Sequence, residues 1–423
     1  MEDKTVSYIH QIATVDFDAL RKHRVTTLQK AMRDYDIDVY FVCTPGNVRY
    51  MTDYHMLPEV GLETAFASIL FQNGDPYLFP LSGDYAWIIE RINWIPKDHI
   101  HPLRAPIGGI HTSPDALIHF FKHLSEVLEK EGVRGGKLAV DTMSYTLAAE
   151  LKSRLPNFEI VGHEPLVLRR ASRCEEEIKL IKMSTAITNT AAATAISMLK
   201  EGVRECDVAA AVGHYYYKEN VDCVTWSPQF LFGPNVAPYF RLTTDRKLER
   251  GDPWYFDIGA QFLGYCSTIS LFGTLGKPTE QQREAYKALY DSTQAVLRMI
   301  RPGVTTADVF MVGDKILEEY GYKKHIQEVP DVPFISCISP VPPSLGWGAD
   351  GIGTLPHEPP NISGLSLNRP IRIEKNMAFR FHPNFFMPRI GGGRLKNMVV
   401  VRETGPELLT KTFDYGAMIF DYP

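Results

Sequence analysis

The chain has 423 residues, of which 44% are hydrophobic and 22% are charged, a composition typical of a folded protein and not of a disordered one. Its formal net charge is −5, with both signs spread along the chain and no basic block, so we expect no nucleic-acid partner. The six cysteines are scattered along the chain, which indicates reduced thiols and not a disulfide framework. The N-terminus lacks the apolar core of a signal peptide, and no apolar run is long enough to span a bilayer. We therefore expect a cytoplasmic protein of more than one domain that does not contact a membrane.

The first 165 residues alternate between helical and strand patterns and predict one α/β domain. Apolar residues recur with helical spacing over Asp18–Asp34. A run of β-branched and aromatic residues predicts a strand over Asp38–Thr44. Two further runs, Ala67–Phe71 and Tyr77–Leu81, flank an Asn-Gly pair and predict a hairpin. Lys137–Asp141 is expected to form another short strand.

A second domain is expected from residue 166 onward. Ser172 and Glu175 have the spacing of a capping box, which predicts that a long helix begins there. Another helix is expected near Cys206–Asn220. The residues Asp252–Gly273 then predict a long hairpin.

Helices and then strands are predicted for the rest of the second domain. Thr279 and Gln282 form a second capping box, which opens a further helix. The final third returns to strand patterns over Ala378–Phe386 and Arg394–Val401. The three glycines Gly391–Gly393 predict a turn or bulge, because no helix follows that would make them a phosphate-binding loop.

Five segments of this chain occur in an order and spacing that match the motifs of one known family. They are NVRYMTD (47–53), ERGDPWYFDIGAQFLGYCSTISLFGTLGKPTEQQREAY (249–286), ADGIGTLPHEPP (349–360), NMAFRFHPNFF (376–386) and GGGRLKNMVVVRETGPELLT (391–410). Together they resemble the creatinase/prolidase/methionine-aminopeptidase family, in which the first segment is a strand and loop. The resemblance implies an α/β (α+β) fold, with a creatinase-like N-terminal α/β domain at 1–165. A C-terminal pita-bread domain at 166–423 would contain a curved antiparallel sheet with flanking helices.

Members of that family hold two metal ions with two Asp, one His and two Glu, and the ions activate a water for amide hydrolysis. The resemblance places these ligand positions, in chain order, at Asp257, Thr268, Asp350, His382 and Lys396. Only the first keeps its family ligand. An ammonium repels a divalent ion but attracts the two carboxylates, so we interpret Lys396 as a built-in cation that replaces the metal. No metal or other cofactor is therefore expected.

The catalytic residues implied by the resemblance are Asp257, Asp350, His382 and Lys396 at these positions, together with His357 of the retained pair His357-Glu358. His382 or His357 would be the general base, while Asp257 and Asp350 orient it or bind a cationic group of the substrate. Lys396, expected within hydrogen-bonding distance of Asp257, would stabilise negative charge. The alternative is a structural salt-bridge network that fills an inactive site.

Further residues are predicted to bind the substrate. Tyr239 stands where the family has a substrate-side histidine, and Arg241 and Arg380 suit a carboxylate. Glu358 and Thr268 complete this set. The alternatives are surface or interdomain salt bridges for Arg241 and a packing role for the His357-Glu358 pair.

By analogy with creatinase and ectoine hydrolase, the resemblance implies a metal-independent hydrolase that cleaves a C–N bond of amide, cyclic amidine or guanidino type in a small polar substrate. One alternative is a metal-dependent Xaa-Pro peptidase or a dimethylsulfoniopropionate lyase-like enzyme. Another is a non-catalytic protein that binds a small molecule. The resemblance also implies a homodimer in which residues 54–60 approach the partner's site.

Overall fold

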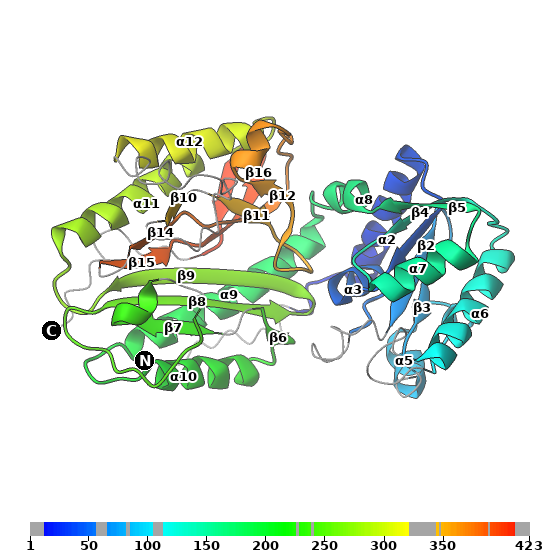
Figure 1. Ribbon diagram of the computed structural model, residues 1–423, viewed down its shortest axis with the longest axis horizontal. Helices are drawn as coiled ribbons and strands as arrows, with labels where there is room; N and C mark the ends of the chain where they lie inside the picture. The colour runs from blue at the N-terminus through cyan, green and yellow to red at the C-terminus, as the bar shows by residue number, and fades with distance from the viewer. Residues whose placement is uncertain are drawn as a thin grey trace. The chain divides into compact units, whose positions relative to one another are not determined.

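The computed structural model describes residues 12–55, 66–81, 85–104, 113–225, 228–237, 241–320, 344–346, 348–387 and 390–410. The chain forms two compact units, one of Asp16–Arg170 and one built mainly from Ala171–Pro423 (Figure 1). None of the helices in the described ranges is both long enough and apolar enough to cross a lipid bilayer.

The N-terminal unit is built on a five-stranded mixed sheet in the order β3-β2-β1-β4-β5. Its strands are β1 (Val39–Val42), β2 (Ala67–Phe71), β3 (Tyr77–Phe79), β4 (Gly136–Val140) and β5 (Phe158–Gly162). β1 pairs antiparallel with β2 and parallel with β4, and β4 pairs parallel with β5. Parallel neighbours need crossover connections, and the helices of this unit supply them.

Both faces of this sheet are covered by helices. The helices are α2 (Phe17–Asp34), α3 (Pro45–Thr52), α5 (Tyr85–Arg91), η2 (Lys97–His99), α6 (Pro114–Lys130), α7 (Tyr145–Arg154) and α8 (Glu164–Arg169). In β1, Tyr40 and Val42 join the apolar cluster formed with α2 and α3. Val39 and Phe41 join the opposite cluster, formed with α6 and α7. A strand that is buried on both faces carries apolar residues without alternation, as observed here.

The predicted elements of this unit are present, with one correction. NVRYMTD, expected as a strand and loop, lies in helix α3 and the residue that follows it. Pro45 begins the helix, where its missing N–H costs nothing, and Asp53 ends it in the left-handed conformation with φ of 63°. The Asp53 carboxylate accepts hydrogen bonds from Arg21 (2.7 Å) and Arg24 (2.6 Å), which stabilise this helix end.

In the residues that the structure describes, the strands of the C-terminal unit form three antiparallel sheets. Its strands are β6 (Cys223–Val224), β7 (Gln229–Phe232), β8 (Pro253–Phe262), β9 (Tyr265–Thr274), β10 (Ser344–Gly346), β11 (Ala349–Gly351), β12 (Glu358–Ile362), β13 (Ala378–Phe381), β14 (Asn384–Met387), β15 (Gly391–Arg394), β16 (Asn397–Arg402) and β17 (Gly405–Leu408). One sheet has the order β6-β8-β7, with β9 paired to β8, and the others are β12-β11-β13-β16-β17 and β10-β14-β15. The predicted hairpin is β8–β9, whose turn residues Leu263 and Gly264 have positive φ.

In the described part of this unit, four α-helices flank these sheets. They are α9 (Glu175–Ser197), α10 (Glu205–Lys218), α11 (Glu280–Met299) and α12 (Thr306–Glu319), with the short helices η4 (Gly233–Val236) and η6 (Gly364–Leu367) between strands. α9 and α10 lie on one side of the sheets, and α11 and α12 lie on the other (Figure 1). The mixed α/β architecture expected from the sequence is confirmed.

The cap of α9 differs from the prediction. Cys174 is the N-cap residue, and the carboxylate of Glu177 accepts a hydrogen bond from the Cys174 amide at 3.0 Å. Ser172, the predicted cap, donates its hydroxyl proton to the carbonyl of Lys375 at 2.6 Å instead. The predicted capping box of Thr279 and Gln282 is confirmed.

The two final strands of the prediction are each broken in the structure. The first ends at Phe381 and resumes at Asn384, because His382 is followed by Pro383, which has no N–H for the ladder. The second is divided between β15 and β16, which are separated by Leu395 and Lys396. Gly391–Gly393, predicted as a turn, lies within β15 instead, where a Cβ on Gly393 would collide with the ring of Phe272. Both breaks fall at candidate site residues.

Candidate active site

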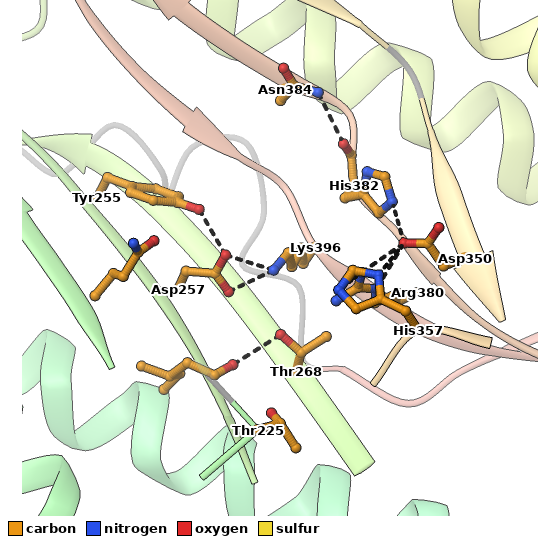
Figure 2. A network of polar contacts seen from close by, with 12 residues as sticks. Thr225, Tyr255, Asp257, Thr268, Asp350, His357, Arg380, His382, Asn384 and Lys396 are labelled. Atoms are coloured by element: carbon orange, nitrogen blue, oxygen red, sulfur yellow. Dashed lines mark hydrogen bonds and ion pairs between the residues drawn. The ribbon is translucent and has the colours of Figure 1, made fainter. Parts of the chain in front are cut away.

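Lys396 and Asp257 form a buried ion pair. The Lys396 Nζ lies 2.7 Å from Oδ1 and 2.6 Å from Oδ2 of Asp257, and the two side chains are 0% and 5% exposed. Tyr255 donates its hydroxyl proton to Asp257 Oδ2 at 3.0 Å. The contact expected between Lys396 and Asp257 is therefore present (Figure 2).

The backbone holds Lys396 beside the β8–β9 hairpin. Lys396 follows the end of β15 at Arg394 and precedes the start of β16 at Asn397. It forms an isolated bridge with Ser270 of β9, and its amide lies 3.3 Å from the Ser270 carbonyl. Because Ser270 is the direct partner of Asp257 in the hairpin, this bridge places the ammonium next to the carboxylate.

Asp350 is the centre of a second group of contacts. Asp350 in β11 lies opposite Arg380 in β13, and Arg380 donates to Asp350 Oδ2 from Nη2 (2.7 Å) and Nε (3.2 Å). The Nε2 atom of His382 lies 3.0 Å from the same oxygen, and the Nδ1 atom of His357 lies 3.3 Å from it. Arg380 Nη2 also contacts both ring nitrogens of His357. One carboxylate oxygen thus receives three side chains.

These contacts determine the protonation states around Asp350. Burial acts to raise the pKa of Asp350, but hydrogen bonds from His357 and His382 and the charge of Arg380 hold it far below its ordinary range. Burial lowers the pKa of His382, and Asp350 opposes that shift only in part. We therefore assign an ionised Asp350 and a neutral His382 whose proton is on Nε2, because a carboxylate only accepts.

The two groups of contacts influence each other electrostatically. Burial lowers the pKa of Lys396 to about 7, Asp257 works against this shift, and the charges of Arg380 and Arg394 add to it. The charge of Lys396 in turn helps to lower the pKa of His382. Figure 2 shows both groups in one view. We call Tyr255, Asp257, Asp350, His357, Arg380, His382 and Lys396 the polar cluster; it contains all five predicted catalytic residues and the predicted substrate residue Arg380.

The other predicted residues lie elsewhere or are engaged differently. Glu358 is 1% exposed, forms an ion pair with Arg173 and accepts a hydrogen bond from the Leu355 amide at 2.9 Å. Thr268 donates its hydroxyl proton to the carbonyl of Ile258 at 3.1 Å and is also buried.

The two remaining predictions are Arg241 and Tyr239. Arg241 lies on the surface of the C-terminal unit. Tyr239 lies outside the described residues.

Tyr255 and Arg394 were missed as site residues. Both could have been found, because each is two residues away from a predicted site residue. Residues at i and i+2 of a strand point to the same face, which applies directly to Tyr255 and Asp257 in β8. Arg394 is the last residue of β15, and burial lowers its pKa to about 9.

Comparison with known proteins decides the family. The profile of metallopeptidase family M24 matches residues 179–403, and that of the creatinase/prolidase N-terminal domain matches residues 24–170. The chain belongs to metallopeptidase family M24. It is 26% identical over 395 residues to an Xaa-Pro dipeptidase of Pyrococcus furiosus, covering 92% of this chain and 98% of that protein. It is 25% identical over 389 residues to an uncharacterised peptidase of Staphylococcus epidermidis, covering 92% of this chain and 99% of the relative.

Solved structures share the fold of this chain. A dipeptidase from Pyrococcus horikoshii matches with a TM-score of 0.74 at 21% identity, over 92% of this chain and 98% of that one. A prolidase from Pyrococcus furiosus matches with a TM-score of 0.70 at 23% identity, over 91% and 99%. The expected family and pita-bread fold are confirmed. Metallopeptidases hydrolyse peptide C–N bonds, so hydrolysis of a C–N bond agrees with the family in its broad form.

The residues at which the family resemblance places the metal ligands do not fit a pair of divalent ions. Lys396 occupies both oxygens of Asp257, and Arg380 and His382 occupy Oδ2 of Asp350. Two unit charges 4 Å apart at an effective dielectric of 20 interact by about 4 kcal/mol, so an ammonium would repel a divalent ion by about 8 kcal/mol. Among the described residues of Ala171–Pro423, no three His, Cys, Asp or Glu side chains bring ligand atoms within 4.8 Å of one another.

Proposed function

We propose that this protein hydrolyses a C–N bond in a small polar substrate of the peptide class. Membership of family M24 supports the reaction type. The relative from Pyrococcus furiosus is named an Xaa-Pro dipeptidase, and the similar structures are named dipeptidase and prolidase. These names favour an Xaa-Pro peptide over the cyclic amidine and guanidino substrates that the creatinase and ectoine hydrolase analogy suggested.

The observation that carries the proposal is the pairing of His382 with Asp350. Asp350 receives the Nε2 hydrogen of His382, so the lone pair of the neutral ring is on Nδ1. Within the described part of the chain, His382 Nδ1 has no hydrogen-bond partner although the residue is only 3% exposed. A buried imidazole with a free lone pair, oriented by a carboxylate, has the arrangement of a general base.

The charges of the polar cluster suit the other half of the reaction. When a water oxygen bonds to the carbonyl carbon, its proton moves to Nδ1 of His382 and negative charge develops on the carbonyl oxygen. Arg380 is a buried cation that stabilises such charge, and so is Lys396 below its pKa of about 7. The C–N bond then breaks, and the leaving nitrogen takes the proton from His382.

A free carboxylate on the substrate agrees with the charge balance around this site. Arg380, Arg394 and Lys396 are buried cations, and Asp257 and Asp350 are the buried carboxylates that pair with Lys396 and Arg380. When all five residues are ionised, their net charge is +1, which favours an anionic group on the substrate. A dipeptide with a free C-terminal carboxylate supplies such a group.

The test is a substrate panel with chelator-treated protein. Xaa-Pro dipeptides, the same dipeptides amidated at the C-terminus, Xaa-Ala dipeptides and guanidino compounds are incubated separately, and products are measured by mass spectrometry. We expect hydrolysis of free Xaa-Pro dipeptides and at least tenfold slower hydrolysis of the amidated forms. Hydrolysis of guanidino compounds alone, or of nothing in the panel, would contradict the proposal.

A metal-dependent Xaa-Pro dipeptidase is the second candidate, favoured by the relative of that name. It predicts that the chelated protein is inactive and that added Mn²⁺ restores turnover. Running the same panel with and without Mn²⁺ separates the two candidates.

A further inference from the structure

We infer that Lys396 and Arg380 are fixed side-chain cations that take the place of the two metal ions of the family, so the polar cluster binds no pair of divalent ions. This inference deepens the proposed function, because it concerns how the same site supplies positive charge. Its test measures metal binding and not turnover, so the two proposals fail separately.

The first cation contacts its carboxylate as a metal ion would. Lys396 Nζ reaches both oxygens of Asp257, at 2.7 and 2.6 Å, and a bound metal would need those same lone pairs. The Lys396 side chain is 0% exposed, and its backbone is held against Ser270 of β9. The ammonium therefore has no route to solvent that would open the position for an ion.

The second cation is placed by the register of the sheet. Asp350 and Arg380 are direct partners across β11 and β13, so their side chains leave the sheet at the same position. Arg380 donates to Asp350 Oδ2 from two nitrogens, and His382 fills a third approach to that oxygen at 3.0 Å. Arg380 is 1% exposed. An ion that binds Oδ2 of Asp350 would have to displace a buried guanidinium.

The two cations belong to one arrangement. Arg380 pairs with Met398 across β13 and β16, and Lys396 comes two residues before Met398 in the chain. Arg380 is close enough to lower the pKa of Lys396. The two buried positive charges are tolerated because each has its own carboxylate. Asp257 pairs with Lys396, and Asp350 pairs with Arg380. Two buried pairs of a cation and a carboxylate thus line the site.

Restoring the family ligands tests the inference. The variant Thr268→Asp/Asp350→His/His382→Glu/Lys396→Glu carries the full ligand set that the family resemblance places at these positions. Wild type, this variant and Lys182→Glu are dialysed against Mn²⁺. Lys182 is the matched control, because it also pairs with a carboxylate, that of Glu407 at 2.5 Å, but is 41% exposed. Electron paramagnetic resonance then reports whether two bound Mn²⁺ ions are spin-coupled neighbours.

We expect no coupled pair in wild type or in Lys182→Glu, and a coupled pair in the restored variant. A coupled pair in wild type would overturn the inference. So would a restored variant that is folded by circular dichroism and still binds no pair. If that variant does not fold, the melting temperature of wild type is the deciding measurement. We expect the same melting temperature in Mn²⁺ and in chelator. A melting temperature that rises with added Mn²⁺ and saturates at two ions per chain would overturn the inference.

Discussion

His382 and Asp350 share a buried hydrogen bond of 3.0 Å between Nε2 and Oδ2, although 32 residues separate them in the chain. Asp350 also binds Arg380 and His357 through the same oxygen. This convergence makes His382 the better of the two candidate bases, because both ring nitrogens of His357 already contact Arg380.

Replacing His382 with Gln should reduce kcat by roughly 10²–10⁴ at unchanged fold, the usual contribution of a general base. His357→Gln is the matched control, and we expect a loss of less than tenfold because that side chain is 45% exposed. Burial lowers the pKa of His382, so the acid limb of kcat/KM should fall below the ordinary histidine value of about 6.5. Equal kcat for wild type and His382→Gln would exclude His382 as the base.

Lys396→Met should lower the free energy of unfolding by about 3–5 kcal/mol, because it leaves the buried carboxylate of Asp257 without its cation. Lys182→Met removes an ion pair of similar length, but that pair is 41% and 34% exposed, so the loss should be at most about 1 kcal/mol. Urea denaturation of both variants measures the difference. Equal losses would show that burial does not distinguish the two pairs.

The contribution of Lys396 to stability should increase with pH. Its pKa in the folded chain is about 7, below the ordinary 10.5, because burial disfavours the charged form. Between these values the unfolded chain binds the proton and the folded chain does not, so raising the pH favours the folded state. The free energy of unfolding of wild type minus that of Lys396→Met should grow by up to about 1.4 kcal/mol per pH unit from pH 7 to 10. If the difference in the free energy of unfolding between wild type and Lys396→Met stays constant or falls over this pH range, the prediction is wrong.

Glu358→Gln should affect stability more than substrate binding. Glu358 forms an ion pair with Arg173 and accepts from the Leu355 amide, so its loss should cost about 1.5–3 kcal/mol, typical of hydrogen bonds to charged groups. Glu201→Gln, at an exposed pair with Arg250, is the control and should be nearly neutral. A large rise in KM with unchanged stability would restore the substrate-binding role predicted from the sequence.

We propose that the chain is a homodimer, as the family resemblance implies. Multi-angle light scattering at micromolar concentration should give twice the chain mass of 47.8 kDa. A monomeric mass would count against the proposal. Of the segment 54–60, which we expect near the partner's site, residues 56–60 lie outside the described residues.

The sequence alone predicted the features that depend on neighbours along the chain. Helix α2, the β2–β3 and β8–β9 hairpins and the cap at Thr279 follow from residue spacing and turn chemistry within a few positions. The sequence also predicted the pairing of Lys396 with Asp257. The family motifs place both residues at the same site, and their opposite charges attract each other.

Only the tertiary structure decided which side chains meet across strands and helices that are distant in the chain. Strand register placed Arg380 opposite Asp350, and the fold brought Arg173 to Glu358, 185 residues later. Whether His382 and Lys396 lie in strands or in breaks between strands was also settled there. A shift of one residue in register turns a side chain to the other face of a sheet, and residue spacing within one strand contains no information about that register.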